Sequence, residues 1–376
     1  MMMKLLNIIA VTSLFFAGAT ANCSNTEYGC CSPGNNEVRY VDNSGNWGIE
    51  NGNWCFMQPE GSNNQVQAQI NNTSNSLVVS GNTFDSMFFG AWVGGKDVKQ
   101  PTAQNIAAFQ ALQERHLDVV HLFVIWQYND WNWAREYLQI AKENGSITMI
   151  SWMPTPHTAQ NILDGAADDY IKTFANGVKE FGDEIWLRPL HESNGDWYTW
   201  GTGKDSVNNA EDKVAGAYRH IVDIFRGLGV NNVKWIWTTN CSNSGSSTFR
   251  GSYPGDEYVD YISIDGYNWG TAQSWSSWSS FEEVFTPSYQ AISQFNKPMF
   301  LAEFSSSELG GDKAGWITDM FRVLPEKFPK IVGLVWFSES KPDNEGDWAL
   351  DSSPAAVEAW KKGISTYPEA HRKTSN

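Results

Sequence analysis

Two glutamates lie just beyond short apolar runs, and each has aromatic residues nearby in the sequence. Glu192 lies in RPLHESNGDWYTWG at 188–201, and Glu303 lies in KPMFLAEFSS at 297–306. A pair of carboxyl groups can cleave a glycosidic bond, because one protonates the leaving oxygen while the other acts at the anomeric carbon. A separation of about 5–5.5 Å would retain the configuration and a wider gap would invert it. The sequence does not give that distance.

The two glutamates would need different protonation states. Glu192 is flanked by His191, Trp197 and Trp200. Partial burial there and a neighbouring carboxylate would raise its pKa, which favours Glu192 as the general acid/base. Glu303 would then be the nucleophile.

An ionised Glu303 needs hydrogen-bond donors. Tyr267, at the end of a predicted strand, could offer its hydroxyl, and Arg188 could add positive charge. For Arg188 an ion-pair role inside the fold is an equal alternative, and Asp265 could brace a loop. His191 could be a core histidine, although its place beside Glu192 favours the site.

Several aromatic residues follow predicted strands and could stack on sugar rings. Tryptophan combines a large flat apolar face with one polar N–H group. The residues expected to contact substrate are His191, Trp197, Tyr267, Trp336, Arg188 and Trp269. Trp186, Trp235 and Trp237 lie inside predicted strands and are assigned to packing, as is His121 in another strand.

The elements that must position these residues alternate between strand and helix. The strand candidates are 88–93, 118–126, 147–153, 184–190, 233–239, 259–265, 298–303 and 331–337. The helix candidates between them include 103–115, 132–143, 166–181, 209–228, 281–295 and 311–323. Continuous apolar strands separated by helices indicate a parallel sheet covered by helices.

Eight such units predict an α/β fold of the (β/α)8 TIM-barrel type, in which functional residues follow the strands. The stretch 241–257 is rich in Gly and Ser and shows no full helix. A doubly wound open sheet is the alternative, but GAWVGG at 90–95 does not match the glycine pattern of its nucleotide loop.

Composition and motifs exclude several other functions. The net charge of −16 argues against nucleic acid and anionic membranes as partners, because phosphate groups need clustered Lys and Arg. The chain has no H-E-x-x-H, G-x-S-x-G or P-loop motif. We expect no cofactor and no metal, since both catalytic groups would be side chains. The alternative from another class of function is a carbohydrate-binding barrel without turnover, which would keep the tryptophans but could dispense with one carboxylate. Both Glu192 and Glu303 are present, which favours an enzyme.

The chain divides into five predicted segments. Residues 1–21 read as a secretory signal peptide, so we expect a secreted, extracellular protein. Residues 22–58 form a small module with four cysteines, 59–83 a polar linker, 84–366 the catalytic domain and 367–376 a tail. Two disulfides among Cys23, Cys30, Cys31 and Cys55 would replace a core in that module, with three connectivities open. Cys241 is left as a free thiol.

The two glutamate segments resemble those of glycoside hydrolase family 26, whose members are (β/α)8 retaining enzymes. The resemblance covers 84–366 and implies Glu192 as acid/base and Glu303 as nucleophile. It implies that His191, Trp197, Tyr267 and Trp336 shape the subsite of the attacked sugar. EIWLRPLHE, RHIVDIFR and YPGDEYVDYISIDGYNWGTAQSW look most like the lichenase branch, which implies an endo-β-1,3-1,4-glucanase. The alternative is an endo-β-1,4-mannanase.

The cysteine-rich segment resembles the dockerin-like modules of anaerobic fungi, which are related to family 10 carbohydrate-binding modules. The resemblance lies in C-x6-CC followed by VDNSGNWGIENGNWC. It implies attachment to a scaffold protein of a multi-enzyme complex, with direct cellulose binding as the alternative. The candidate contact residues are Tyr40, Trp47 and Trp54.

Overall fold

A computed structural model describes residues 31–32, 40–42, 45–50, 53–56, 87–94, 100–341 and 345–368. The chain forms two units, Met1–Leu77 and Val78–Asn376, which are described separately. The predicted signal peptide at 1–21 and the linker at 59–83 lie outside the described residues, as do Cys23, Cys30 and the side chains of Tyr40, Trp47 and Trp54. Among the described helices, none has the length and apolar character needed to cross a membrane.

The first unit contains a small antiparallel sheet in the order β1-β2-β3. Its strands are β1 (Tyr40–Asp42), β2 (Gly45–Glu50) and β3 (Asn53–Phe56). A disulfide joins Cys31 to Cys55, with an S–S distance of 2.06 Å. In a segment too small for a full core, such a covalent link supplies stability that packing cannot.

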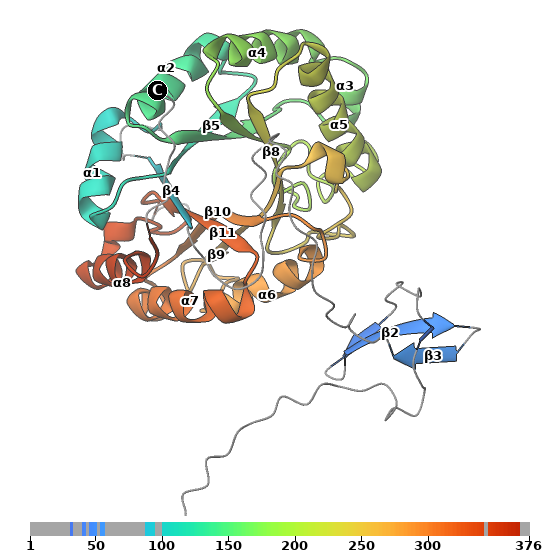
Figure 1. The fold of residues 1–376 in the computed structure, drawn as a ribbon. Helices are drawn as coiled ribbons and strands as arrows, with labels where there is room; N and C mark the ends of the chain where they lie inside the picture. Colours follow the sequence, from blue (N-terminus) through green and yellow to red (C-terminus); the bar gives the residue numbers. More distant parts are fainter. Residues whose placement is uncertain are drawn as a thin grey trace, which may run out of the picture. The chain divides into compact units, whose positions relative to one another are not determined.

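The second unit is a closed barrel of eight parallel strands in the order β10-β11-β4-β5-β6-β7-β8-β9 (Figure 1). The strands are β4 (Phe88–Val93), β5 (Val119–Ile125), β6 (Ile147–Met153), β7 (Ile185–Pro189), β8 (Val233–Asn240), β9 (Tyr261–Asn268), β10 (Met299–Ser306) and β11 (Ile331–Ser338). All eight predicted strands are present; two match at both ends and the other ends differ by at most three residues. The predicted (β/α)8 barrel is therefore confirmed.

The helices surround the strands (Figure 1). They are α1 (Ala103–Gln113), α2 (Trp131–Glu143), α3 (Ala159–Leu163), α4 (Asp168–Phe181), α5 (Glu211–Gly227), α6 (Phe281–Ile292), α7 (Lys313–Lys327) and α8 (Pro354–Ile364). Between β8 and β9 the described chain has only the short 3-10 helix η2 (Asp256–Tyr258), as the Gly- and Ser-rich sequence predicted. A second short 3-10 helix, η3 (Leu350–Ser352), precedes α8.

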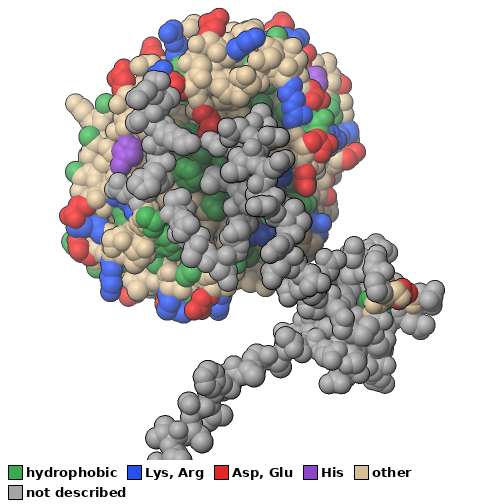
Figure 2. Space-filling model, in the orientation of Figure 1, with side chains coloured by type: hydrophobic (Ala, Val, Ile, Leu, Met, Phe, Trp, Pro, Cys, Tyr) green, Lys and Arg blue, Asp and Glu red, His purple; other side chains and the backbone are tan. Residues whose placement is uncertain are grey.

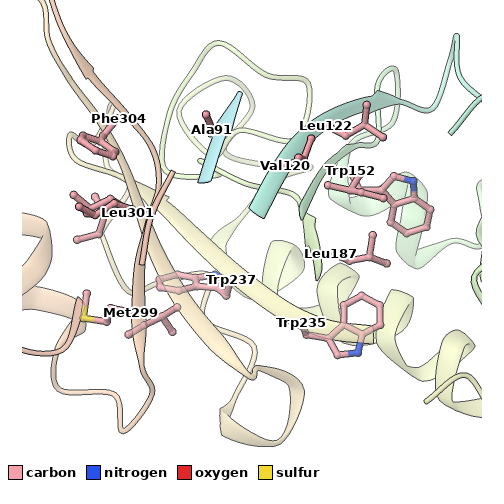
Figure 3. Packing of buried hydrophobic residues seen from close by; sticks show 14 of the residues in the cluster. Ala91, Val120, Leu122, Trp152, Leu187, Trp235, Trp237, Met299, Leu301 and Phe304 are labelled. Carbon is pink, nitrogen blue, oxygen red and sulfur yellow. The ribbon is translucent and has the colours of Figure 1, made fainter. Parts of the chain in front are cut away.

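The core has two layers because successive residues of a strand point to opposite faces. Inside the barrel, Val119, Met149, Trp186, Phe300 and Val335 pack together. The outward-facing side chains, among them Leu122, Trp152, Leu187, Trp235, Trp237 and Leu301, belong to the larger cluster shared with the helices (Figure 3). Both layers are apolar, which explains why the strands read as continuous apolar runs.

Candidate active site

Glu192 follows β7 in a turn with unusual backbone angles. Leu190 has φ of 55° and Glu192 has φ of 53°, both in the left-handed region. Side chains other than glycine seldom adopt this conformation, and it costs on the order of 1 kcal/mol or more per residue. The turn is held by the Glu192 amide, which donates to the carbonyl of Thr238 at 3.2 Å. Such strain concentrates at functional sites, where surrounding contacts maintain it.

Glu192 is 6% exposed, and its carboxyl group accepts two hydrogen bonds. Asn240 Nδ2 donates to Oε1 at 2.7 Å and Trp197 Nε1 donates to Oε2 at 2.8 Å. Burial, with a smaller contribution from the charge of Glu303, raises the pKa of Glu192 to about 7, although the two donors oppose the shift. A carboxyl group in this range can both carry and release a proton near neutral pH.

Glu303 lies on β10, next to an irregularity in the pairing with β9 between Leu301 and Glu303. Its Oε1 accepts hydrogen bonds from Arg188 Nη2 and from Ser151 Oγ, the latter at 3.3 Å. Its Oε2 accepts from the Tyr267 hydroxyl at 3.1 Å. These donors fix the orientation of the carboxyl group.

Arg188 forms an ion pair inside the fold and also places its positive charge beside Glu303, the two roles considered from the sequence. Its guanidinium is fully buried and donates to Asp265 Oδ1 at 2.7 Å as well as to Glu303. A third bond reaches Ser151 Oγ at 2.7 Å. Burial raises the pKa of Asp265 well above its usual range, although the charge of Arg188 opposes this effect. The guanidinium of Arg188 thus joins the carboxyl groups of Asp265 and Glu303.

The two histidines of the site are buried. His121 Nε2 lies 2.6 Å from Ser151 Oγ and 3.8 Å from Glu303 Oε1, so this residue assigned to packing borders the site. His191 Nε2 lies 3.2 Å from the Tyr198 hydroxyl, and its ring also packs near Trp200. Burial lowers the pKa of both histidines, and the charge of Arg188 adds to the effect. Both are thereby favoured in the neutral form.

The expected aromatic platforms divide into two groups. Trp197 is 45% exposed beside Glu192, and Trp269 lies 6.3 Å from Tyr267 between ring centroids. Trp336, however, is fully buried, packs 5.2 Å from Trp360 and donates to the carbonyl of Trp348 at 3.0 Å. The prediction that Trp336 contacts substrate is therefore wrong, because it points from β11 toward the helices, opposite to Phe337.

Three further residues belong to the site but were not singled out in the sequence. Ser151 connects Arg188 and Glu303, and Asn240 holds Glu192. Trp348 packs 5.0 Å from Tyr267 and comes from the connection between β11 and α8. Asn240 lies one residue beyond a predicted strand, so inspection of every strand end would have found it. No periodic pattern marks Trp348.

The carboxyl ends of the strands form the mouth of the barrel, where two carboxyl groups lie. Glu192, which follows β7, can carry a proton near neutral pH. Glu303, on β10, accepts hydrogen bonds from Arg188, Ser151 and Tyr267. Around the rim of the barrel, acidic and basic side chains are interspersed (Figure 2). Among the described residues, no group of three or more His, Cys, Asp or Glu could hold a metal ion.

Comparison with known proteins shows which families the two parts of the chain resemble. Residues 123–307 match the glycosyl hydrolase family 26 model, and residues 20–57 match the model described as a cellulose or protein binding domain. Endoglucanase H of Acetivibrio thermocellus is 49% identical over 76% of this chain and 31% of its own length. A mannan endo-1,4-β-mannosidase of Caldalkalibacillus mannanilyticus is 24% identical over 57% of this chain and 45% of its own. The chain thus spans less than half of each of these two relatives.

Two further similarities concern the fold and the small module. The β-mannanase from a symbiotic protist of the termite Reticulitermes speratus has a TM-score of 0.53 and 19% identity, over 75% of this chain and 87% of that one. Feruloyl esterase B of Piromyces equi is 43% identical over 16% of this chain and 12% of its own length. This chain therefore carries a glycosyl hydrolase family 26 domain, matched over residues 123–307, and an N-terminal module of the cellulose or protein binding family.

Proposed function

We propose that the barrel is a retaining endo-glycoside hydrolase for β-linked plant cell-wall polysaccharides, with Glu192 as acid/base and Glu303 as nucleophile. The observation that carries the proposal is the contrast between the two carboxyl groups. Burial raises the pKa of Glu192 to about 7, whereas Arg188 and Tyr267 donate hydrogen bonds to Glu303.

In the first step a carboxylate oxygen of Glu303 attacks the anomeric carbon. The bond from that carbon to the glycosidic oxygen breaks, and Glu192 gives its proton to the departing oxygen. The products are a glycosyl ester on Glu303, a free chain end on the leaving sugar and an ionised Glu192. Tyr267 and Arg188 then lose a charged acceptor, which limits the stability of the ester.

In the second step Glu192 takes a proton from water, whose oxygen attacks the anomeric carbon and releases Glu303. The change of role follows from electrostatics. The charge of Glu303 contributes to the raised pKa of Glu192, and ester formation removes that charge. The pKa of Glu192 therefore falls when it must act as a base, and it rises again once Glu303 is free.

The substrate we propose is mixed-linkage β-1,3-1,4-glucan. It is favoured by the 49% identity to endoglucanase H over most of this chain. β-1,4-Mannan is the second candidate, since mannanases are also similar at 24% identity. Both substrates are uncharged polymers and would suit a mouth lined by aromatic residues.

We also propose that the protein is secreted and that residues 22–58 attach it to a scaffold protein. The match to a cellulose or protein binding domain and the similarity to a feruloyl esterase support this role. Cellulose is the alternative ligand. Pull-down of the full chain on crystalline cellulose, compared with pull-down on scaffold modules from enzyme complexes, separates the two.

The experiment for the barrel measures reducing-sugar release from barley β-glucan, lichenan, galactomannan and glucomannan. Glu192→Ala and Glu303→Gln are the controls, and both are expected to lose nearly all activity. Release from the first two polymers alone supports the glucanase assignment, and release from galactomannan alone refutes it. NMR of the first-formed anomer tests retention, and an inverted product contradicts the nucleophile role. Unchanged hydrolysis by Glu303→Gln would refute the mechanism.

A further inference from the structure

Trp275 is a large apolar side chain that the fold leaves in solvent. It is 69% exposed and lies in the loop 269–280, which connects β9 to α6. Burying such a side chain is worth several kcal/mol, so a protein gains stability by covering it unless it serves another purpose. The same loop starts two residues after Tyr267, the donor to Glu303.

A continuous row of aromatic rings leads from Glu303 to Trp275. The Tyr267 hydroxyl is 3.1 Å from Glu303 Oε2, and the Tyr267 ring is 6.3 Å from Trp269. Trp269 lies 5.1 Å from Trp275 between centroids. Behind the row, buried Trp348 packs 5.0 Å from Tyr267 and 4.9 Å from Trp269. The row therefore has one face supported by the protein.

The loop is tied down at several points, so the position of Trp275 is fixed before any ligand arrives. Asn268 Oδ1 accepts from the amides of Gly270 at 3.2 Å and Ser279 at 3.0 Å. The Thr271 amide donates to the carbonyl of Leu309 at 3.0 Å. Gly270 has φ of 53°, and a Cβ there would lie 1.8 Å from that same carbonyl oxygen, so only glycine permits this approach.

A further hydrogen bond joins the loop 269–280 to the connection between β11 and α8, which carries Trp348. Gln273 Nε2 donates to the carbonyl of Glu345 at 2.9 Å, and Ser276 Oγ donates to the carbonyl of Gly270 at 2.8 Å. An exposed ring on a preorganised loop binds a ligand with little further loss of conformational entropy.

The composition of the loop indicates what kind of ligand it takes. Residues 269–280 are WGTAQSWSSWSS, with no charged residue. Flat rings among hydroxyl and amide groups match the faces and hydroxyl groups of an uncharged sugar chain. A protein-docking patch would need a larger contiguous apolar area than this loop offers.

We propose that Trp275 and Trp269 form a platform for the sugar rings on the glycone side of the attacked residue. This rests on the proposed function. Glu192 protonates the leaving oxygen, so the leaving sugars lie on its side of the mouth, beside Trp197. The rings that stay bonded to Glu303 lie on the wall of Tyr267, where the row begins.

The test compares Trp275→Ala with the wild-type chain on aryl glycosides that share one leaving group and carry one to four sugars. The sugar unit is that of the polymer the wild type hydrolyses. We expect the variant to keep kcat/KM on the shortest substrate within about twofold and to lose about tenfold or more on the longest. Trp275→Phe keeps a flat ring and should recover part of the loss. Leu309→Ala, which trims a 55% exposed apolar side chain beside the same loop, should match the wild type on all lengths.

Three outcomes would overturn the platform. They are no loss on any length, an equal loss on every length, and a loss that appears only when the leaving group is extended. Calorimetric titration of the Glu303→Gln chain with polymer, with and without Trp275→Ala, gives a readout without turnover. Activity retained by the Glu303→Gln chain would refute the mechanism, whereas the comparison of Trp275→Ala with the wild type on substrates of increasing length would still test the platform.

Discussion

The indole N–H of Trp197 donates to Oε2 of Glu192 at 2.8 Å, while almost half of the ring stays exposed at the mouth. This bond stabilises the ionised carboxylate and lowers its pKa, whereas burial and Glu303 act in the opposite direction. The balance leaves the pKa of Glu192 at about 7. A single side chain thus borders the site and adjusts the strength of the acid.

We predict that kcat/KM falls as the pH rises through about 7, because Glu192 must be protonated for the first step. Trp197→Phe removes a donor that favours the charged form. The pKa of Glu192 should then increase, and the alkaline limb of the profile should move to higher pH. The measurement is kcat/KM against pH for both proteins, on a substrate whose leaving group needs protonation.

A substrate with an acidic phenol as leaving group provides the control, since its departure needs no acid. Its alkaline limb should be weaker in both proteins. If Trp197→Phe moved the limb to lower pH, the assignment of the limb to Glu192 would be wrong.

A second prediction concerns the buried charges around Arg188. Arg188→Met leaves the carboxylates of Asp265 and Glu303 without their cation, which is expected to cost about 3–5 kcal/mol of unfolding free energy. The double variant with Asp265→Leu should lose less than the sum of the two single variants, because the two charges interact directly. Urea unfolding of the four proteins measures the coupling.

Arg322→Met is the matched control, because Arg322 pairs with Asp319 on the surface, where both side chains are more than half exposed. It should change the unfolding free energy little. Additive effects of the two buried substitutions would contradict a direct interaction between Arg188 and Asp265.

The order of strands and helices could be predicted because apolar runs and helical patterns alternate along residues 88–337. Glu192 and Glu303 could be selected as candidates because each lies at the end of such a run. The direction in which the Trp336 side chain points could not be predicted. Both faces of a parallel barrel strand are apolar, so no alternation in the sequence reveals which side chains point inward. Arg188 lies inside a strand, and its two acidic partners come from β9 and β10, so only the folded chain shows its contacts.

The corrected position of Trp336 gives a third prediction. Trp336→Phe keeps an aromatic ring in the core but loses the bond to the Trp348 carbonyl, which should cost about 1 kcal/mol of unfolding free energy. Its kcat/KM should stay near the wild-type value, because the ring does not reach the mouth. Trp197→Phe, measured in parallel, should change the pH profile instead. A large increase in KM for Trp336→Phe with stability unchanged would restore its role in substrate contact.

The last prediction concerns Lys313, a buried amine at the start of α7. Its Nζ donates to the Ala349 carbonyl at 2.6 Å and to Ser352 Oγ at 2.8 Å, which anchors the connection that carries Trp348. Lys313→Met would remove both of these charge-assisted bonds and leave the Ala349 carbonyl with the longer bond from the Ser352 amide at 3.3 Å, at a cost of about 1–3 kcal/mol. Burial lowers the pKa of Lys313 from 10.5 to about 8.

This shift fixes the sign of a pH effect. Between pH 8 and 10.5 the unfolded chain holds the Lys313 proton more tightly than the folded chain, so the contribution of this residue to stability rises with pH in that window. The stability difference between the wild type and Lys313→Met should therefore grow with pH. Lys361 is the contrast, because hydrogen bonds to Glu114 and Glu358 raise its pKa, so its contribution to stability stays constant up to about pH 10.5 and is lost only above that pH. Urea unfolding of the wild type, Lys313→Met and Lys361→Met between pH 8 and 10.5 tests this prediction. If the unfolding free energies of the two variants, each relative to the wild type, changed in parallel with pH, the buried-amine explanation would be refuted.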